Sequence, residues 1–173
     1  NLILSAQERN ENHAWRYTPD SNDADSTVSG CQIVALLAAR NAGIPVPDEA
    51  IKLGLDYLKS CRSENGAYGY TSASGEKPTL TAIGLTCFAL AKQKDEAGFA
   101  SSVEYLKNHL NYRDRHYPYY FEYYMSQALF HGSDELWENW NTNNIRYLAA
   151  SQNRDGSWVD NKGNHFATAA ALL

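Results

Sequence analysis

The chain has few cysteines and no long apolar run. Its three cysteines, at positions 31, 61 and 87, are an odd number, and none stands in a Cys-x-x-Cys pair of the kind that binds zinc. Cys31 and Cys87 each lie within an apolar helical run, so we expect free, buried thiols. No stretch resembles a signal peptide or the roughly 20 consecutive apolar residues of a membrane span.

Basic residues are also scarce. The 15 lysines and arginines are outnumbered by 20 aspartates and glutamates, which gives a net charge of −5. A nucleic-acid surface needs a basic stripe, so the sequence predicts no nucleic-acid partner. It shows no alternating strand pattern, no Gly-x-Ser-x-Gly elbow, no phosphate loop and no paired Cys/His nucleophile.

The length of 173 residues, 43% of them hydrophobic, suits a single domain spanning 1–173 with a sizeable core. The chain starts at Asn1 and stops within an apparent helix that opens near His165. We therefore expect a fragment of a longer protein, truncated at both ends.

Two kinds of helical pattern alternate along the chain. Three runs, near residues 28–38, 82–90 and 119–130, are dominated by apolar residues, which is typical of deeply buried helices. The segments that follow them, near 47–59, 96–110 and 133–150, carry one apolar stripe each. This alternation is explained by stacked helix pairs, in which one helix is buried and the other is half exposed to solvent.

A linker with an aromatic residue follows each pair. The clearest is Gln152-Asn153-Arg154-Asp155-Gly156-Ser157-Trp158. Asp155-Gly156 predicts a turn, because glycine accepts positive φ. We expect the Gln152 amide to bond carbonyls left unpaired at the helix end, and Trp158 to pack over the turn with its N–H bonded.

Weaker copies of this linker occur earlier, at Gln7 to Trp15, at 62–70 and at 113–118. Tyr68 and Trp158 are 90 positions apart, which accommodates two units of about 45 residues.

The pattern Gln152-x-x-Asp155-Gly156-Ser157-Trp158 resembles the QW motif of squalene and oxidosqualene cyclases. The whole chain resembles the prenyltransferase and squalene-oxidase repeat of the terpenoid cyclase and protein prenyltransferase superfamily. The resemblance implies an all-α fold, an α/α toroid of stacked helical hairpins. Only about three helix pairs are present, so a partial ring is expected, which a second copy or the parent chain would complete.

The resemblance also suggests a catalytic acid. Class II cyclases protonate their substrate with the middle Asp of a DxDD motif, and Asp23-Ala24-Asp25-Ser26 is similar to it. Asp25 would donate the proton and Asp23 would be the neighbouring carboxylate. The last Asp of the motif is Ser26 here, and Asp25 also precedes an apolar helix, where capping is the simpler interpretation.

Other family sites are incomplete. The zinc-ligating His of protein prenyltransferases aligns with Ala167, and no Asp-x-Cys triplet occurs, so no metal and no cofactor is predicted. The thioester segment Cys-Gly-Glu-Gln of complement-like relatives is missing as well. A tyrosine cluster has two interpretations, the aromatic lining of a ligand cavity or bulky filler of a narrow ring. Its members are Tyr117, Tyr119, Tyr120, Tyr123 and Tyr124, and the last four are the predicted cavity residues.

Two functional hypotheses follow. The first is a non-catalytic squalene-cyclase-like repeat domain that binds an apolar, isoprenoid-like ligand or a protein partner. The alternative is a class II terpene cyclase relative that uses Asp25. A desolvated Asp25 facing an aromatic cavity would favour the enzyme, and an Asp25 bonded to backbone amides would favour the binding domain.

Overall fold

The computed structural model describes residues 2–173, and this part of the chain is all-α, as predicted. It contains no strand; Arg62 and Tyr68 form an isolated antiparallel bridge. None of the helices described has both the length and the hydropathy of a membrane span. The helices are α1 (Leu2–Arg9), α2 (Ser26–Asn41), α3 (Asp48–Ser60), α4 (Pro78–Leu90), α5 (Phe99–Lys107), α6 (Pro118–Gly132), α7 (Asp134–Ser151) and α8 (Asn164–Leu172).

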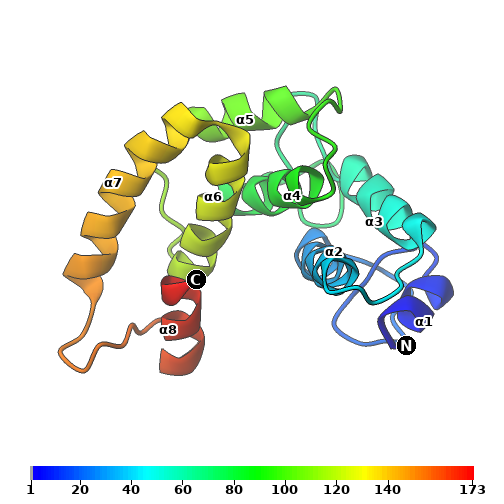
Figure 1. Cartoon of the computed structure of the whole chain (residues 1–173), viewed down its shortest axis with the longest axis horizontal. Helices are drawn as coiled ribbons and strands as arrows, with labels where there is room; N and C mark the ends of the chain where they lie inside the picture. Colours follow the sequence, from blue (N-terminus) through cyan, green and yellow to red (C-terminus); the bar gives the residue numbers. More distant parts are fainter. Residues whose placement is uncertain (1) are drawn as a thin grey trace.

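The helices pack as successive pairs along an arch (Figure 1). Helix α2 contacts α3, α4 contacts α5, and α6 contacts α7. A second set of contacts runs from α2 to α4, from α4 to α6 and from α6 to α8. We call α2, α4, α6 and α8 the inner helices, because each of them contacts the next one in the series.

Burial follows the predicted alternation most clearly in the second pair. Every residue of α4 from Pro78 to Ala89 is buried, since α4 lies between α2 and α6. Its partner α5 buries only Phe99, Ser102 and Leu106.

Helix α2 is buried on one face only, which corrects the expectation of a helix buried nearly all round. Cys87 on α4 is buried as predicted, but Cys31 on α2 is exposed, so that prediction is wrong. The physical reason is position: α2 has a neighbouring inner helix, α4, on one side only. The apolar pattern alone does not distinguish an end helix from a middle one.

One hydrogen bond recurs between three of the four linkers and the inner helix that follows each of them. The backbone N–H of the linker aromatic donates to a hydroxyl in the first turns of that helix. The three bonds are Trp15 N to Ser29 Oγ (3.1 Å), Tyr68 N to Thr81 Oγ1 (3.0 Å) and Trp158 N to Thr168 Oγ1 (3.0 Å). In α6 the corresponding position is Phe121, which lacks a hydroxyl, and the Tyr112 ring packs edge-on against it at 5.2 Å.

The linker at 152–158 folds largely as predicted. Gly156 has φ +85°, and the Trp158 indole N–H is bonded, to the Leu148 carbonyl at 3.0 Å. The prediction for Gln152 is wrong, because its amide donates to the Gly156 carbonyl of the turn at 2.9 Å. The indole, rather than the glutamine, therefore satisfies a carbonyl in the last turn of α7.

We predict that Thr81→Val destabilises the protein by about 1–3 kcal/mol, because valine has a similar volume but leaves the buried Tyr68 N–H without an acceptor. Urea unfolding measures the change. Thr86→Val is the matched control. The Thr86 hydroxyl donates to the Ala82 carbonyl of its own helix, so its removal leaves no backbone N–H without an acceptor. Equal effects of the two substitutions would contradict the role given to the linker bond.

Candidate ligand-binding pocket at the start of the inner helices

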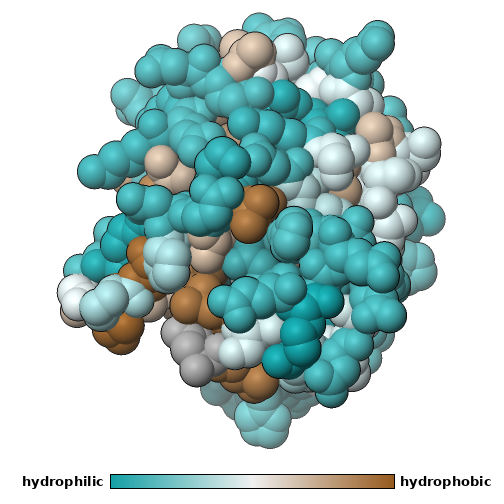
Figure 2. Space-filling view, turned by 90° about the vertical axis from the view of Figure 1, so that its right-hand side faces the viewer, coloured by the Kyte–Doolittle hydropathy of each residue, from teal (hydrophilic) through white to brown (hydrophobic). Residues whose placement is uncertain are grey.

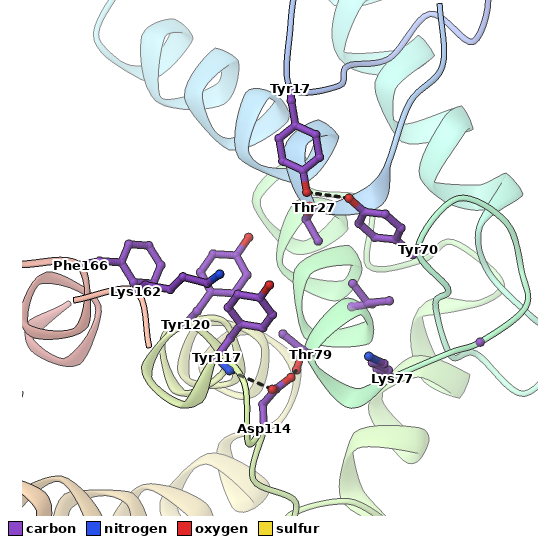
Figure 3. A pocket seen from close by; sticks show the side chains of 12 residues that line it. Tyr17, Thr27, Tyr70, Lys77, Thr79, Asp114, Tyr117, Tyr120, Lys162 and Phe166 are labelled. Atoms are coloured by element: carbon purple, nitrogen blue, oxygen red, sulfur yellow. Dashed lines mark hydrogen bonds between the residues drawn. The ribbon is translucent and has the colours of Figure 1, made fainter. Parts of the chain in front are cut away.

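A pocket of about 470 Å³ lies where the N-terminal ends of the inner helices come together (Figure 3). This volume is in the usual range for small-molecule sites. Its walls come from loops and first helical turns far apart in the sequence. The lining residues are Tyr17, Thr27, Tyr70, Gly75, Lys77, Thr79, Leu80, Asp114, Tyr117, Tyr120, Lys162 and Phe166.

The pocket has a buried floor and a solvent-exposed rim. Thr79 and Leu80, in the first turn of α4, are buried. Tyr120 of α6 is half-buried and stacks on the exposed Phe166 of α8, with ring centroids 6.1 Å apart. Tyr117, at the start of α6, is 41% exposed. The arrangement suits a ligand whose apolar body enters between the helices while one end stays near water.

Two linker tyrosines form the opposite wall. The hydroxyls of Tyr17 and Tyr70 are hydrogen-bonded at 2.7 Å, and the Arg16 guanidinium lies 5.3 Å and 5.2 Å from the two ring centroids. Burial and the bond to Tyr17 raise the pKa of Tyr70. Like any tyrosine hydroxyl at neutral pH, that of Tyr70 is able both to donate and to accept a hydrogen bond.

Asp114 contributes a buried carboxylate to the wall. One oxygen accepts from the Thr79 hydroxyl at 2.7 Å, and the other accepts from the backbone N–H groups of His116 and Tyr117 at 2.9 and 3.0 Å. Burial alone would raise the pKa of Asp114, but these three bonds and the nearby Lys77 outweigh it, so the pKa lies below its usual value. Asp114 is thus a fixed negative charge that joins α4 to the start of α6.

Asp25 is the N-cap of α2, as the simpler interpretation predicted. Its Oδ1 accepts from the backbone N–H groups of Thr27 and Val28 at 2.8 and 2.9 Å and from the Thr27 hydroxyl at 2.5 Å. Its Oδ2 accepts from Arg16 at 3.2 Å. Asp23 is largely exposed and pairs with the same guanidinium at 3.3 Å. Asp25 is completely buried and is not among the residues that line the pocket.

The four tyrosines predicted as cavity lining are distributed over several environments. Tyr120 lines the pocket. Tyr119 packs instead with Trp158 and Ala167 in a separate cluster. Tyr124 is buried behind Tyr120, with ring centroids 5.0 Å apart, and Tyr123 meets Tyr124 edge-on at 4.9 Å. Successive positions on one helix face different directions, so the cluster could not act as one wall.

Tyr117, which belongs to the same tyrosine cluster, also lines the pocket, but the other lining residues were missed by sequence reasoning. Tyr17 and Tyr70 each follow a linker aromatic by two positions, and this spacing was the available signal. Lys77 and Lys162 carried no signal, because each is a single lysine in a polar loop. They are 85 positions apart in the sequence, and only the fold brings both to one rim.

Glu122 of α6 is a buried carboxyl outside the pocket, and sequence reasoning missed it. Its side chain is 2% exposed, and Arg113 Nε lies 3.3 Å from Oε1. The geometry is too poor for a hydrogen bond, and neither carboxyl oxygen has a hydrogen-bond partner within the described residues. Burial raises the pKa of Glu122 to about 7, although Arg113 opposes the shift. The Tyr147 ring of α7 faces the same Arg113, with 5.2 Å between guanidinium carbon and ring centroid.

We predict that Glu122 makes stability depend on pH. The pKa is raised in the folded state, from 4.5 to about 7, so the folded chain binds the proton more tightly than the unfolded chain. Stability should therefore fall by about 3 kcal/mol as pH rises through that window and level off above it. Glu122→Gln, which does not titrate, should remove this component, so the variant should be the more stable protein at pH 8.

Urea unfolding of both proteins at pH 5 and pH 8 measures the difference. Glu104→Gln, at an exposed pair with Lys107, is the matched control and should leave the pH dependence unchanged. Parallel curves for the native chain and Glu122→Gln would contradict the prediction.

No group of three or more His, Cys, Asp or Glu within residues 2–173 is placed to hold a metal ion. Comparison with known protein families gives no match, and comparison with curated proteins gives none either.

Proposed function

We propose that this chain is a squalene-cyclase-like α/α repeat domain that binds an apolar ligand in the pocket at the start of the inner helices. The observation that carries the proposal is the pocket itself, about 470 Å³ with five aromatic rings in its walls. Aromatic walls give a large apolar contact area, and their hydroxyls give a few directional bonds.

The proposed architecture is a partial toroid. Three features support it. The inner helices contact one another in chain order, and α2, α4 and α6 each contact the helix that follows them in the chain, α3, α5 and α7. The bond between linker and inner helix also occurs three times. In such a ring the N-terminal ends of the inner helices gather at one end, which is where the pocket lies.

The second candidate is a class II cyclase relative that protonates a polyprene with Asp25. One observation favours it: Thr27, whose hydroxyl bonds Asp25, lines the pocket. A proton donor, however, needs an oxygen that carries the proton and faces the substrate. Both Asp25 oxygens accept bonds from donors of the chain itself, so the binding role is the better supported.

A protein partner, with a second copy of the chain as one form of it, is a further part of the proposal. Figure 2 views the end of the molecule near α1 and shows apolar side chains gathered in its lower half. Leu2 of α1 is 66% exposed, and Leu172 of α8 is 70% exposed. Sedimentation velocity tests self-association: a monomer at every concentration would contradict the second copy.

We predict that a neutral ring-containing lipid, methyl dehydroabietate, raises the melting temperature. At a ligand concentration 100 times Kd the stabilisation is about 2.7 kcal/mol, which corresponds to roughly 5–10 °C for a chain of this size. Tyr120→Ala should abolish most of the shift, because it removes a ring of the pocket wall. Tyr105→Ala, a half-buried tyrosine of α5 outside this pocket, is the control and should keep it.

Absence of a shift for the native chain with methyl dehydroabietate and with squalene would overturn the pocket as a lipid site. Incubation of the protein with squalene, followed by product analysis, separates the two candidates. A cyclised product that the Asp25→Asn variant does not form would establish the class II cyclase instead.

A further inference from the structure

We infer that the pocket takes a ring-containing apolar molecule with a single carboxylate, which Lys77 and Lys162 hold at the rim. The inference rests on the proposed function, because it assumes that this pocket is the binding site. It adds the charge of the ligand, the end of the ligand that stays near water and the residues that recognise it.

The two lysines lie on opposite sides of the pocket (Figure 3). Lys77 precedes α4 and Lys162 precedes α8, and both side chains are exposed. Neither ammonium takes part in an ion pair among the described residues: the ion pairs found there involve other cations. Lys162 instead lies 4.8 Å from the centroid of the Tyr117 ring.

Other cations of the described residues also lie outside the ion pairs, but Lys77 and Lys162 are the two that line this pocket. Two lysines outside any ion pair stand beside a cavity whose walls include five aromatic rings. Apolar walls lower the local dielectric constant, so an anion at this rim is attracted more strongly than it would be on an open surface. The arrangement therefore selects a ligand whose charged end is negative and lies at the mouth.

Asp114 limits the negative charge that the ligand can carry at its charged end. Its carboxylate is a fixed charge in the same wall, and the bonds from Thr79, His116 and Tyr117 keep it ionised. No arginine lines the pocket, so the bidentate donors that suit phosphate groups are missing. Two lysines opposed by one aspartate leave a net single positive charge, which matches a monoanion and disfavours a diphosphate.

The rings define the rest of the molecule. Tyr120 and Phe166 form a stacked pair on one side, and Tyr17 and Tyr70 form a bonded pair on the other. Two aromatic walls on opposite sides suit a body with flat or fused rings, and the buried Leu80 gives an apolar floor. A carboxylate at one end of such a body reaches the rim while the rings stay inside.

A matched pair of probes tests the charge. Dehydroabietic acid and methyl dehydroabietate share the fused rings and differ in the carboxylate. Their affinities are measured by calorimetric titration of the full chain at pH 8, below the critical micelle concentration, at low and at high salt. We expect the acid to bind about tenfold more tightly than the ester, with a preference that shrinks as salt screens the ion pairs.

Variants assign the preference to the two lysines. Lys77→Gln and Lys162→Gln should each lower the affinity for dehydroabietic acid about 2- to 5-fold, as expected for partly exposed ion pairs. The double variant should bind the acid no more tightly than the ester. Affinity for the ester should stay within about twofold, and this readout separates lost recognition from a damaged pocket. Lys107→Gln, at an exposed lysine of α5, is the control and should change neither affinity.

Each other outcome overturns the inference in a distinguishable way. Equal binding of acid and ester, unaffected by the lysine substitutions, removes the anion site and leaves the proposed pocket intact. Binding of farnesyl diphosphate in preference to the acid replaces the monoanion with a diphosphate. Binding of neither acid nor ester removes the proposed function together with this inference.

Discussion

The structure depends on a hydrogen bond that is repeated three times: the N–H of a linker aromatic to a hydroxyl at the start of the next inner helix. Its partners are 10 to 14 residues apart in the chain, and it joins a linker to the start of α2, α4 or α8. It satisfies a backbone donor that a buried linker would otherwise leave unpaired, at a cost of about 1–3 kcal/mol per group. It holds the first turns of α2, α4 and α8 against their linkers, whereas α6 has Phe121 at this position and the Tyr112 ring packs there instead.

The same linkers give the pocket its walls. Trp15 and Tyr68 turn into the core and are almost completely buried, whereas Tyr17 and Tyr70, two positions later, line the pocket. Gly84 of α4 makes room for one core ring, because a Cβ there would lie 2.6 Å from Tyr68. Scaffold and site are thus built from adjacent residues, and a change in a linker is expected to affect both.

Carboxylates take different roles according to their donors. Asp25 and Asp114 accept bonds from backbone amides and hydroxyls at helix starts, so they order the chain. Glu122 is just as buried but has only Arg113 beside it, and its pKa rises to about 7. The capping role of Asp25 was predictable, because an aspartate before an apolar helix is a common cap. The Glu122 environment was not, because it is created by α6, α7 and a linker together.

The sequence by itself determined the local structure. Helix periodicity, the cap at Asp25 and the glycine turn at Gly156 follow from interactions within a few residues, and all three were predicted. The tertiary structure alone decided that Cys31 is exposed, that Tyr120 rather than Tyr119 lines the pocket, and that Lys77 and Lys162 line the same pocket. These outcomes depend on which helices have neighbours and how each is rotated, and a periodic pattern carries no information about partners far along the chain.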